Sequence, residues 1–218
     1  MFGLIAYTVT RHGLAVLLPL GKLILTAFIA TLIFVCITYL PIIKLIGMKI
    51  SDYLKGAFEP WLIAFTTCSS AAALAVNLEA SRKMGASKAI ASFAIPLGNT
   101  INMNGTSIYM GVTAVFAAEV FGIDLTLAQQ FQIVLMGVLA AVGTAGVPGA
   151  GLIMTTLVFT EVGIPLEAVA LIAGIDRILD MIRTSVNVLG DSLTALVVSK
   201  SEGVLGTELM DQDTVVKE

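Results

Sequence analysis

Five polar residues recur at helical spacing near the C-terminal end of an otherwise apolar chain. Separated by four, three, four and four positions, they are Asp176, Asp180, Arg183, Asn187 and Asp191. At about 100° per residue they form a stripe about 80° wide on one helix, with Thr184 at its edge. Its carboxylates suit an ammonium group or a cation, and its guanidinium suits a carboxylate.

The rest of the sequence indicates a membrane protein. Of the 218 residues, 57% are hydrophobic and 12% are charged, against about 25% charged in soluble domains. The net charge of −3 gives no electrostatic footprint for nucleic acid. A charged group at the bilayer centre costs at least about 2.5–3.5 kcal/mol, so the stripe must face protein or a polar path, and it predicts a substrate or ion route. The alternative is a structural ladder that pairs Asp180 with Arg183 and Asp176 with Arg177.

The segments that must position this stripe are spans and interrupted helices. In chain order we expect a partial span at 1–12, a span at 16–46, a hairpin at 51–84, a broken span at 89–122, a second hairpin at 126–160, the striped helix at 165–200 and a polar tail at 201–218. The hairpins centre on "TTCSS" and "GTAGVPGAG", and "INMNGTS" interrupts the broken span. Irregular backbone at such depth requires protein neighbours or a cavity.

Charge placement predicts the topology. Basic residues gather at one set of segment ends, namely Lys44, Lys49, Lys55, Arg82, Lys83, Lys88 and Lys200. The positive-inside rule places these ends, and with them the C-terminus, in the cytoplasm of a multi-pass plasma or inner membrane protein. Both hairpins must then be re-entrant, from opposite faces, as in the inverted repeats of secondary transporters. The alternative is that the Gly-rich stretches are ordinary turns between short spans.

Four motifs together resemble the dicarboxylate/amino acid:cation symporter family, the glutamate transporter homologues. They are "SS" at 69–70, "NMNGT" at 102–106, "GTAGVPGAG" at 143–151 and "DMIRTSVNVLGD" at 180–191, in the order and spacing of that family. The resemblance implies an all-α bundle with two re-entrant hairpins and two broken helices. It also implies elevator-type symport, not enzyme catalysis, by a homotrimer in the lipid bilayer. The cargo would be glutamate, aspartate or a C4-dicarboxylate, coupled to sodium ions or protons without a further cofactor.

The motif match also implies roles for individual residues. Arg183 would hold the side-chain carboxylate of the substrate, and Asp180 its amino group. The other residues implied for this pocket are Ser70, Thr106, Val147, Gly151, Thr184 and Asn187. One sodium site is implied at Gly98, Asn102, Asn187 and Asp191, and another at Thr100, Ala141, Val142 and Thr144. The second hairpin, 126–160, would be the gate.

The chain departs from the family pattern at three positions. Asn104 stands where the family has an aspartate, so a third cation site there is expected to be weak or absent. Some members carry an arginine before the hairpin serines, where this chain has Cys68, or just after the first aspartate of the last motif, where it has Met181. Arg177, one turn from Met181, either supplies a nearby positive charge or pairs with Asp176.

The resemblance covers only the C-terminal part of such transporters. We therefore expect an N-terminally truncated relative or a fragment of a longer gene product. The alternative function is a non-transporting membrane fragment that associates with full-length subunits. An intramembrane aspartyl protease is disfavoured, because the three aspartates share one helix and Val188 replaces the first glycine of the Gly-x-Gly-Asp motif.

Overall fold

The computed structural model describes residues 17–207 without a gap and, before them, residues 3, 6, 10, 13 and 14. These residues form helices joined by turns, and no strand occurs among them. The prediction of an all-α chain is therefore confirmed. The partial span predicted at 1–12 lies outside the continuously described stretch, as does the part of the polar tail at 208–218.

The first long helix is nearly continuous from residue 17 to residue 45. It comprises α2 (Leu17–Phe34), a single π turn η2 (Val35–Tyr39) and α3 (Leu40–Leu45). Among the described helices it alone is long and apolar enough to cross a membrane by length and composition. Tyr39, the last residue of the π turn, is buried and donates its hydroxyl hydrogen to the carbonyl oxygen of Val186 at 3.2 Å.

The next two helices form a tight hairpin. α4 (Ile50–Thr67) and α5 (Ser70–Lys83) pack against each other and are joined by only Cys68 and Ser69. Cys68 adopts the left-handed conformation (φ 56°) that ends α4. Ser69 begins α5, because its hydroxyl oxygen accepts a hydrogen bond from the backbone N–H of Ala72 at 3.2 Å.

The segment after this hairpin is one helix interrupted in its middle. α6 (Lys88–Ile101) ends at Asn102, and α7 (Asn104–Val120) begins after Met103, whose backbone angles (φ −105°, ψ 47°) are not helical. The interruption falls within "INMNGTS". It frees backbone groups and side chains of this stretch to bond with other elements.

A second helix pair follows. α8 (Leu127–Val142) begins at a capping box on Thr126, and α9 (Ala150–Val162) packs beside it. The connection is the loop at residues 143–149. It ends at Gly149, whose positive φ of 80° a residue with a side chain would rarely adopt.

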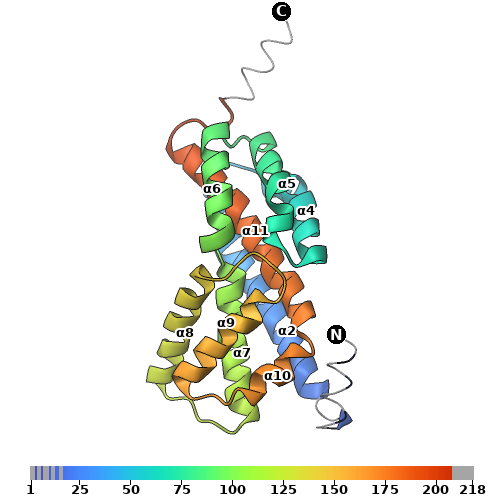
Figure 1. The fold of residues 1–218 in the computed structure, drawn as a ribbon. Coiled ribbons are helices and arrows are strands. Elements are labelled where there is room, and N and C mark those ends of the chain that lie inside the picture. The colour runs from blue at the N-terminus through green and yellow to red at the C-terminus, as the bar shows by residue number, and fades with distance from the viewer. Residues whose placement is uncertain (1–2, 4–5, 7–9, 11–12, 15–16, 208–218) are drawn as a thin grey trace, which may run out of the picture.

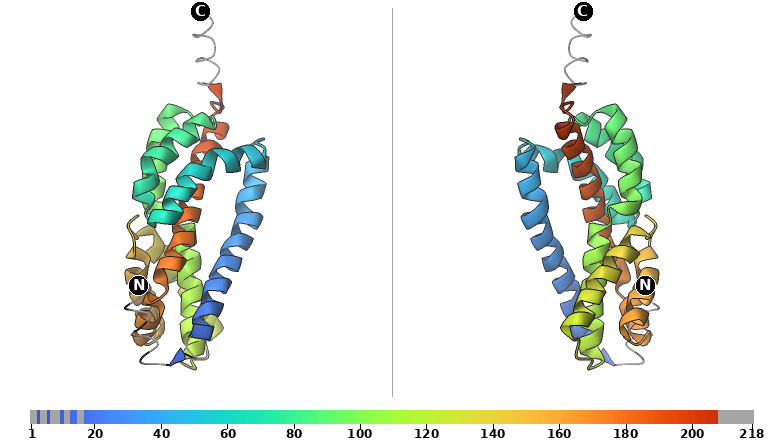
Figure 2. Two further views of the ribbon diagram at one scale, coloured as in Figure 1. Left: turned by 90° about the vertical axis from the view of Figure 1, so that its right-hand side faces the viewer. Right: turned by 90° about the vertical axis from the view of Figure 1, so that its left-hand side faces the viewer.

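α11 (Asp176–Ser201) is the axis of the molecule and follows the short α10 (Glu167–Ala173). Figure 1 shows α4, α5 and α6 around its C-terminal half, and α7, α8 and α9 in the half of the molecule that holds its N-terminus. Figure 2 shows α2 along one side, where it packs against α7 and α11. Every residue from Arg183 to Leu193 is consequently buried.

Apolar packing gives each half of the molecule its own core. One core lies around Met110 and Phe159, and the other around Tyr53 and Leu196. Between them, α7 approaches α11 so closely that a Cβ at Gly105 would meet the backbone of Arg183. The glycine of "NMNGT" is therefore required for the crossing of these helices.

We expect Gly105→Ala to lower the free energy of unfolding by at least about 2 kcal/mol, because backbone atoms cannot yield as the end of a side chain can. Gly111→Ala on the same helix is the matched control, since a Cβ there meets no atom within 4 Å. The control should leave stability unchanged or raise it by up to about 1 kcal/mol. Thermal unfolding of the purified protein in detergent compares them, and equal melting temperatures would contradict the close approach.

Candidate functional site

Three interruptions of helical structure meet beside the middle of α11. They are the turn at 68–69, the break at 102–103 and the loop at 143–149 (Figure 1). A small polar cavity lies at their junction. Its lining includes all the residues that the sequence assigns to the substrate: Ser70, Thr106, Val147, Gly151, Asp180, Arg183, Thr184 and Asn187. The structure brings this set together, and its role stays a prediction.

Arg183 is the central charge of this cavity and is only 3% exposed. Its Nε and Nη2 lie 3.1 and 3.0 Å from Oδ1 of Asp180, and its Nη1 lies 3.7 Å from Oδ1 of Asp176. The guanidinium also lies over the ring of Tyr109, 4.4 Å from the centroid. Among the described residues Nη1 has no hydrogen-bond acceptor. One donor of the guanidinium is therefore left for a further partner.

Asp180 joins the guanidinium to the loop at 143–149. Its Oδ1 also accepts a hydrogen bond from the hydroxyl of Thr184 at 2.7 Å. Its Oδ2 accepts the backbone N–H of Gly149 at 2.9 Å. Of the two predicted pairings on the stripe, the Asp180–Arg183 pair is present, whereas Asp176 contacts Arg183 and accepts the hydroxyl hydrogen of Tyr109 at 2.8 Å.

The loop at 143–149 is bonded on its other side to the first hairpin. The carbonyl oxygen of Gly146 accepts the hydroxyl of Ser69 at 2.9 Å and the backbone N–H of Ala71 at 3.2 Å. At the start of α9, a Cβ on Gly151 would collide with the guanidinium of Arg183. The cavity beneath has a volume of about 10 Å³, close to the room that one water needs. Any molecule larger than a water therefore fits this cavity only if the loop or Arg183 moves.

A second polar cluster surrounds Asp191, which is 2% exposed. Its Oδ1 accepts a hydrogen bond from Nδ2 of Asn102 at 2.9 Å. A Cβ on Gly98 would meet the same carboxylate. The structure thus places Gly98, Asn102 and Asp191 together, as one predicted sodium site requires.

Asn104 completes this cluster as a hydrogen-bond donor. Its Nδ2 lies 2.7 Å from Oδ1 of Asn102 and 3.0 Å from the hydroxyl oxygen of Tyr39. The oxygens that could otherwise face a cation are therefore engaged by a neutral amide. The position expected to be a weak third cation site carries an internally bonded network instead of a free carboxylate.

Asn187 faces both clusters with different groups. Its side-chain Oδ1 accepts the backbone N–H of Gly105 at 2.8 Å, and its Nδ2 donates to the hydroxyl of Thr106 at 3.1 Å. Its carbonyl oxygen, in contrast, accepts from Nδ2 of Asn102 at 3.5 Å. The side chain thus belongs to the polar cavity, whereas the backbone reaches the Asp191 cluster.

The other predicted sodium site is less tightly gathered. Thr100 lies near the end of α6, Ala141 and Val142 end α8, which packs against α6, and Thr144 lies in the loop at 143–149. The two hydroxyls donate to backbone carbonyl oxygens of the preceding turn: that of Thr100 to Leu97, and that of Thr144 to Ala140, at 2.8 and 2.9 Å. Both hydroxyl oxygens keep lone pairs, so they and the backbone carbonyls of these segments are the oxygens that could bind a cation.

Sequence reasoning missed several contributors. Tyr109 binds Asp176 and Arg183, and its place three residues after Thr106 on one helix face could have revealed it. Asn99 packs against Gly146 of the loop, with a buried Oδ1 that lacks a hydrogen-bond partner among the described residues. No sequence pattern points to Asn99.

Arg177 contacts the tip of the first hairpin. Its Nη2 donates to the carbonyl oxygen of Thr66, in the last turn of α4, at 3.1 Å. A second contact joins the same two segments, because the Cys68 thiol lies 3.7 Å from the carbonyl oxygen of Arg177. Of the two roles left open for Arg177, a positive charge at this tip is therefore the one that the geometry supports.

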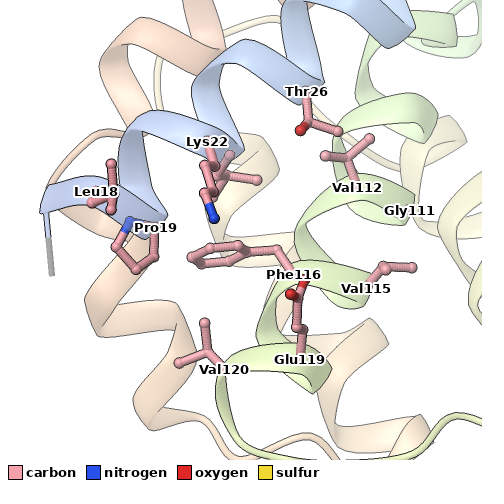
Figure 3. Close-up of a pocket in the computed structure, with 11 residues that line it drawn as sticks. Leu18, Pro19, Lys22, Thr26, Gly111, Val112, Val115, Phe116, Glu119 and Val120 are labelled. Carbon is pink, nitrogen blue, oxygen red and sulfur yellow. The ribbon is translucent and has the colours of Figure 1, made fainter.

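A larger groove lies elsewhere on the molecule. It has a volume of about 570 Å³ and runs between α2 and α7 (Figure 3). Lys22 reaches from α2 toward Phe116 of α7, and most other side chains that line it are apolar. The groove contains none of the striped residues of α11. A binding site chosen by cavity volume alone would therefore be this groove and not the polar cavity.

The chain is similar to known transport proteins over most of its length. The model of the Sodium:dicarboxylate symporter family matches residues 1–201. The chain is 38% identical over 208 residues to a proton/sodium-glutamate symport protein of Geobacillus stearothermophilus, covering 95% of this chain and 49% of the relative. It is also 38% identical to a proton/glutamate-aspartate symporter of Escherichia coli strain K12 (93% and 46% covered) and to a C4-dicarboxylate transport protein of Bacillus subtilis strain 168 (92% and 48%). It therefore spans about half the length of these curated relatives.

We expect Asp176→Asn to lower the free energy of unfolding by about 1–3 kcal/mol, because Arg183 loses one of its two buried carboxylate partners. Glu167→Gln on α10 is the matched control, since that acidic side chain is exposed and should change stability by less than about 0.5 kcal/mol. Thermal unfolding in detergent measures both. Identical shifts for the two variants would show that Asp176 does not stabilise the buried guanidinium.

Proposed function

Because this chain belongs to the sodium:dicarboxylate symporter family, we propose that it carries the substrate and ion sites of a cation-coupled symporter. The proposed cargo is an acidic amino acid, glutamate or aspartate, or a C4-dicarboxylate. The observation that carries the proposal is Arg183, a buried guanidinium with an unused Nη1 donor in a polar cavity. Asp180 and Asp176 already balance the charge of Arg183, but the unused Nη1 donor can bind a further carboxylate, whose two oxygens fit the planar guanidinium.

The substrate would take a defined orientation in this cavity. Its side-chain carboxylate would accept hydrogen bonds from Arg183, and its ammonium group would approach Asp180. The hydroxyl of Thr106 and the amide of Asn187, already bonded to each other at 3.1 Å, would complete the polar wall. Ser70, Val147, Gly151 and Thr184 line the remaining sides. An ammonium group separates an amino acid from a plain dicarboxylate, so Asp180 favours the amino acid.

The coupling ion would bind beside the substrate rather than in the same cavity. Asp191, the backbone of Gly98, Asn102 and the carbonyl oxygen of Asn187 offer the hard oxygen ligands that alkali cations prefer. A second ion would lie between the ends of α6 and α8, on backbone oxygens near Thr100, Ala141, Val142 and Thr144. A cation at Asp191 would cancel a buried negative charge close to the substrate.

We further propose how the chain sits in the membrane. The pairs α4–α5 and α8–α9 would be re-entrant hairpins from opposite faces, and the breaks at 102–103 and between α10 and α11 would complete an inverted repeat. Support comes from the tips of both pairs, which meet beside α11 through the bonds of Gly146. α8–α9 would be the gate of an elevator-type homotrimer in the plasma or inner membrane, with a cytoplasmic C-terminus.

Arg183→Cys should abolish sodium-dependent uptake of aspartate and glutamate, since the cation that holds the substrate carboxylate is removed. Binding of small neutral amino acids can persist. Uptake of labelled amino acids into proteoliposomes, by a complete transporter that carries these residues, measures the effect. Lys200→Cys is the control, because that cation lies exposed at the far end of the same helix. Unchanged uptake of acidic amino acids in Arg183→Cys would refute the role.

Asn104→Asp should raise the apparent affinity for sodium by about tenfold, which corresponds to about 1.4 kcal/mol. An aspartate carboxylate cannot donate to Tyr39 and Asn102, so their oxygens are freed and a negative charge is added. Asn104→Ala, which frees the same oxygens without charge, should show no such gain. The measurement is the sodium dependence of uptake by the two variants. If Asn104→Asp left both the apparent sodium affinity and the coupling unchanged, this account of the cluster would be wrong.

A further inference from the structure

We infer that Asn99 of α6 is a positioning residue that sets the balance between the closed and the lifted position of the loop at 143–149. Only the consequence for transport rests on the proposed function; the effect on the loop does not. Asn99 does not line the polar cavity. Its side chain approaches the site at Gly146 of the loop.

The loop touches Asn99 through Gly146. A Cβ added at Gly146 would lie 3.1 Å from Oδ1 and 3.2 Å from Nδ2 of Asn99, and it would also collide with the hydroxyl of Ser70. Gly146 therefore fits between the start of α5 and the end of α6 only because it lacks a side chain. The Asn99 amide forms one wall of the place that the closed loop occupies.

The amide opposes closure because its oxygen is left without a partner. Oδ1 of Asn99 is buried and has no hydrogen-bond donor within the described part of the chain. A dehydrated, unpaired carbonyl oxygen is less stable than a hydrated one. Lifting Gly146 away admits water to this oxygen, so the unpaired group favours the lifted loop.

Other contacts favour closure. The Gly146 carbonyl oxygen accepts hydrogen bonds from Ser69 and Ala71, and the Gly149 N–H donates to Asp180. The unpaired oxygen of Asn99 and these hydrogen bonds act in opposite directions, so the population of the closed loop depends on the difference between them. Asn99 supplies the contribution that keeps the loop from closing permanently.

Hydrogen exchange tests this inference without a substrate. The backbone N–H groups of Ala71 and Gly149 both bond across the loop junction, so their exchange reports its lifting. In the 218-residue chain in lipid nanodiscs, Asn99→Ala should slow exchange at both amides by about fivefold, because the unpaired oxygen is gone. Asn99→Asp has the same shape but buries a charge, and it should accelerate exchange.

Opposite signs in the two variants distinguish this role from simple packing. If Asn99 only supported the loop, Asn99→Ala would loosen it and accelerate exchange, and that result, or no change, would overturn the inference. Asn77→Ala is the matched control. Asn77 is also buried with an unpaired Oδ1, but its Nδ2 donates to Val188 of α11, away from the loop. Exchange at Ala71 and Gly149 should not respond to it.

Transport kinetics supply a second readout. Asn99→Ala should lower the half-saturating concentration of aspartate or glutamate by about fivefold and also lower the maximal rate, since the loop releases substrate more slowly. If the complete transporter bound no acidic amino acid, the proposed function would be refuted. The hydrogen-exchange result would still decide the role of Asn99. Normal transport with exchange unaffected by Asn99→Ala would reject this inference alone.

Discussion

The guanidinium of Arg183 is buried at the centre of the molecule, only 3% exposed. Arg183 is removed from water, and a buried charge persists only with counter-charges and hydrogen-bond partners around it. Asp180 and Asp176 lie on the same helix as Arg183, so all three charges are buried only if α11 itself is surrounded by other helices. α11 accordingly lies at the axis of the molecule. The burial of every residue from Arg183 to Leu193 follows from this placement.

The surrounding helices supply hydrogen-bond partners to the buried polar groups because several of them begin or end beside α11. A complete helix bonds its own backbone groups and has few left for a neighbour, whereas a helix end leaves N–H and C=O groups free. Gly105 and Gly149 both begin such ends, and their N–H groups bond Asn187 and Asp180. The breaks therefore supply backbone donors that hold two polar side chains of α11 in place at the cavity. The same arrangement explains why small residues gather there.

Much of this arrangement could be predicted from the sequence, because helical periodicity fixes which side chains share a face. The stripe on α11 and its convergence with "SS", "NMNGT" and "GTAGVPGAG" follow from spacing and motif. What escaped prediction depends on tertiary contacts. The choice of Asp176 between Arg177 and Arg183 is set by Tyr109, which arrives from another helix. Likewise, the side chain of Asn187 belongs to the polar cavity and its carbonyl oxygen to the Asp191 cluster. The residue type alone does not predict which group faces which cluster.

The single π turn at Val35–Tyr39 inserts one residue into the first long helix. One additional residue in a helix shifts everything beyond it by about 100° around the axis. Before the turn, Leu20 and Leu23 face the core around Met110, whereas Tyr39 at its end and Ile43 beyond it face the core around Leu196. A one-residue gap here in an alignment would preserve the helix but change its phase, so that one of the two faces would point away from its core. Such a gap would mean that the two halves of this helix are rotated relative to each other about the helix axis, not that the helix is shorter.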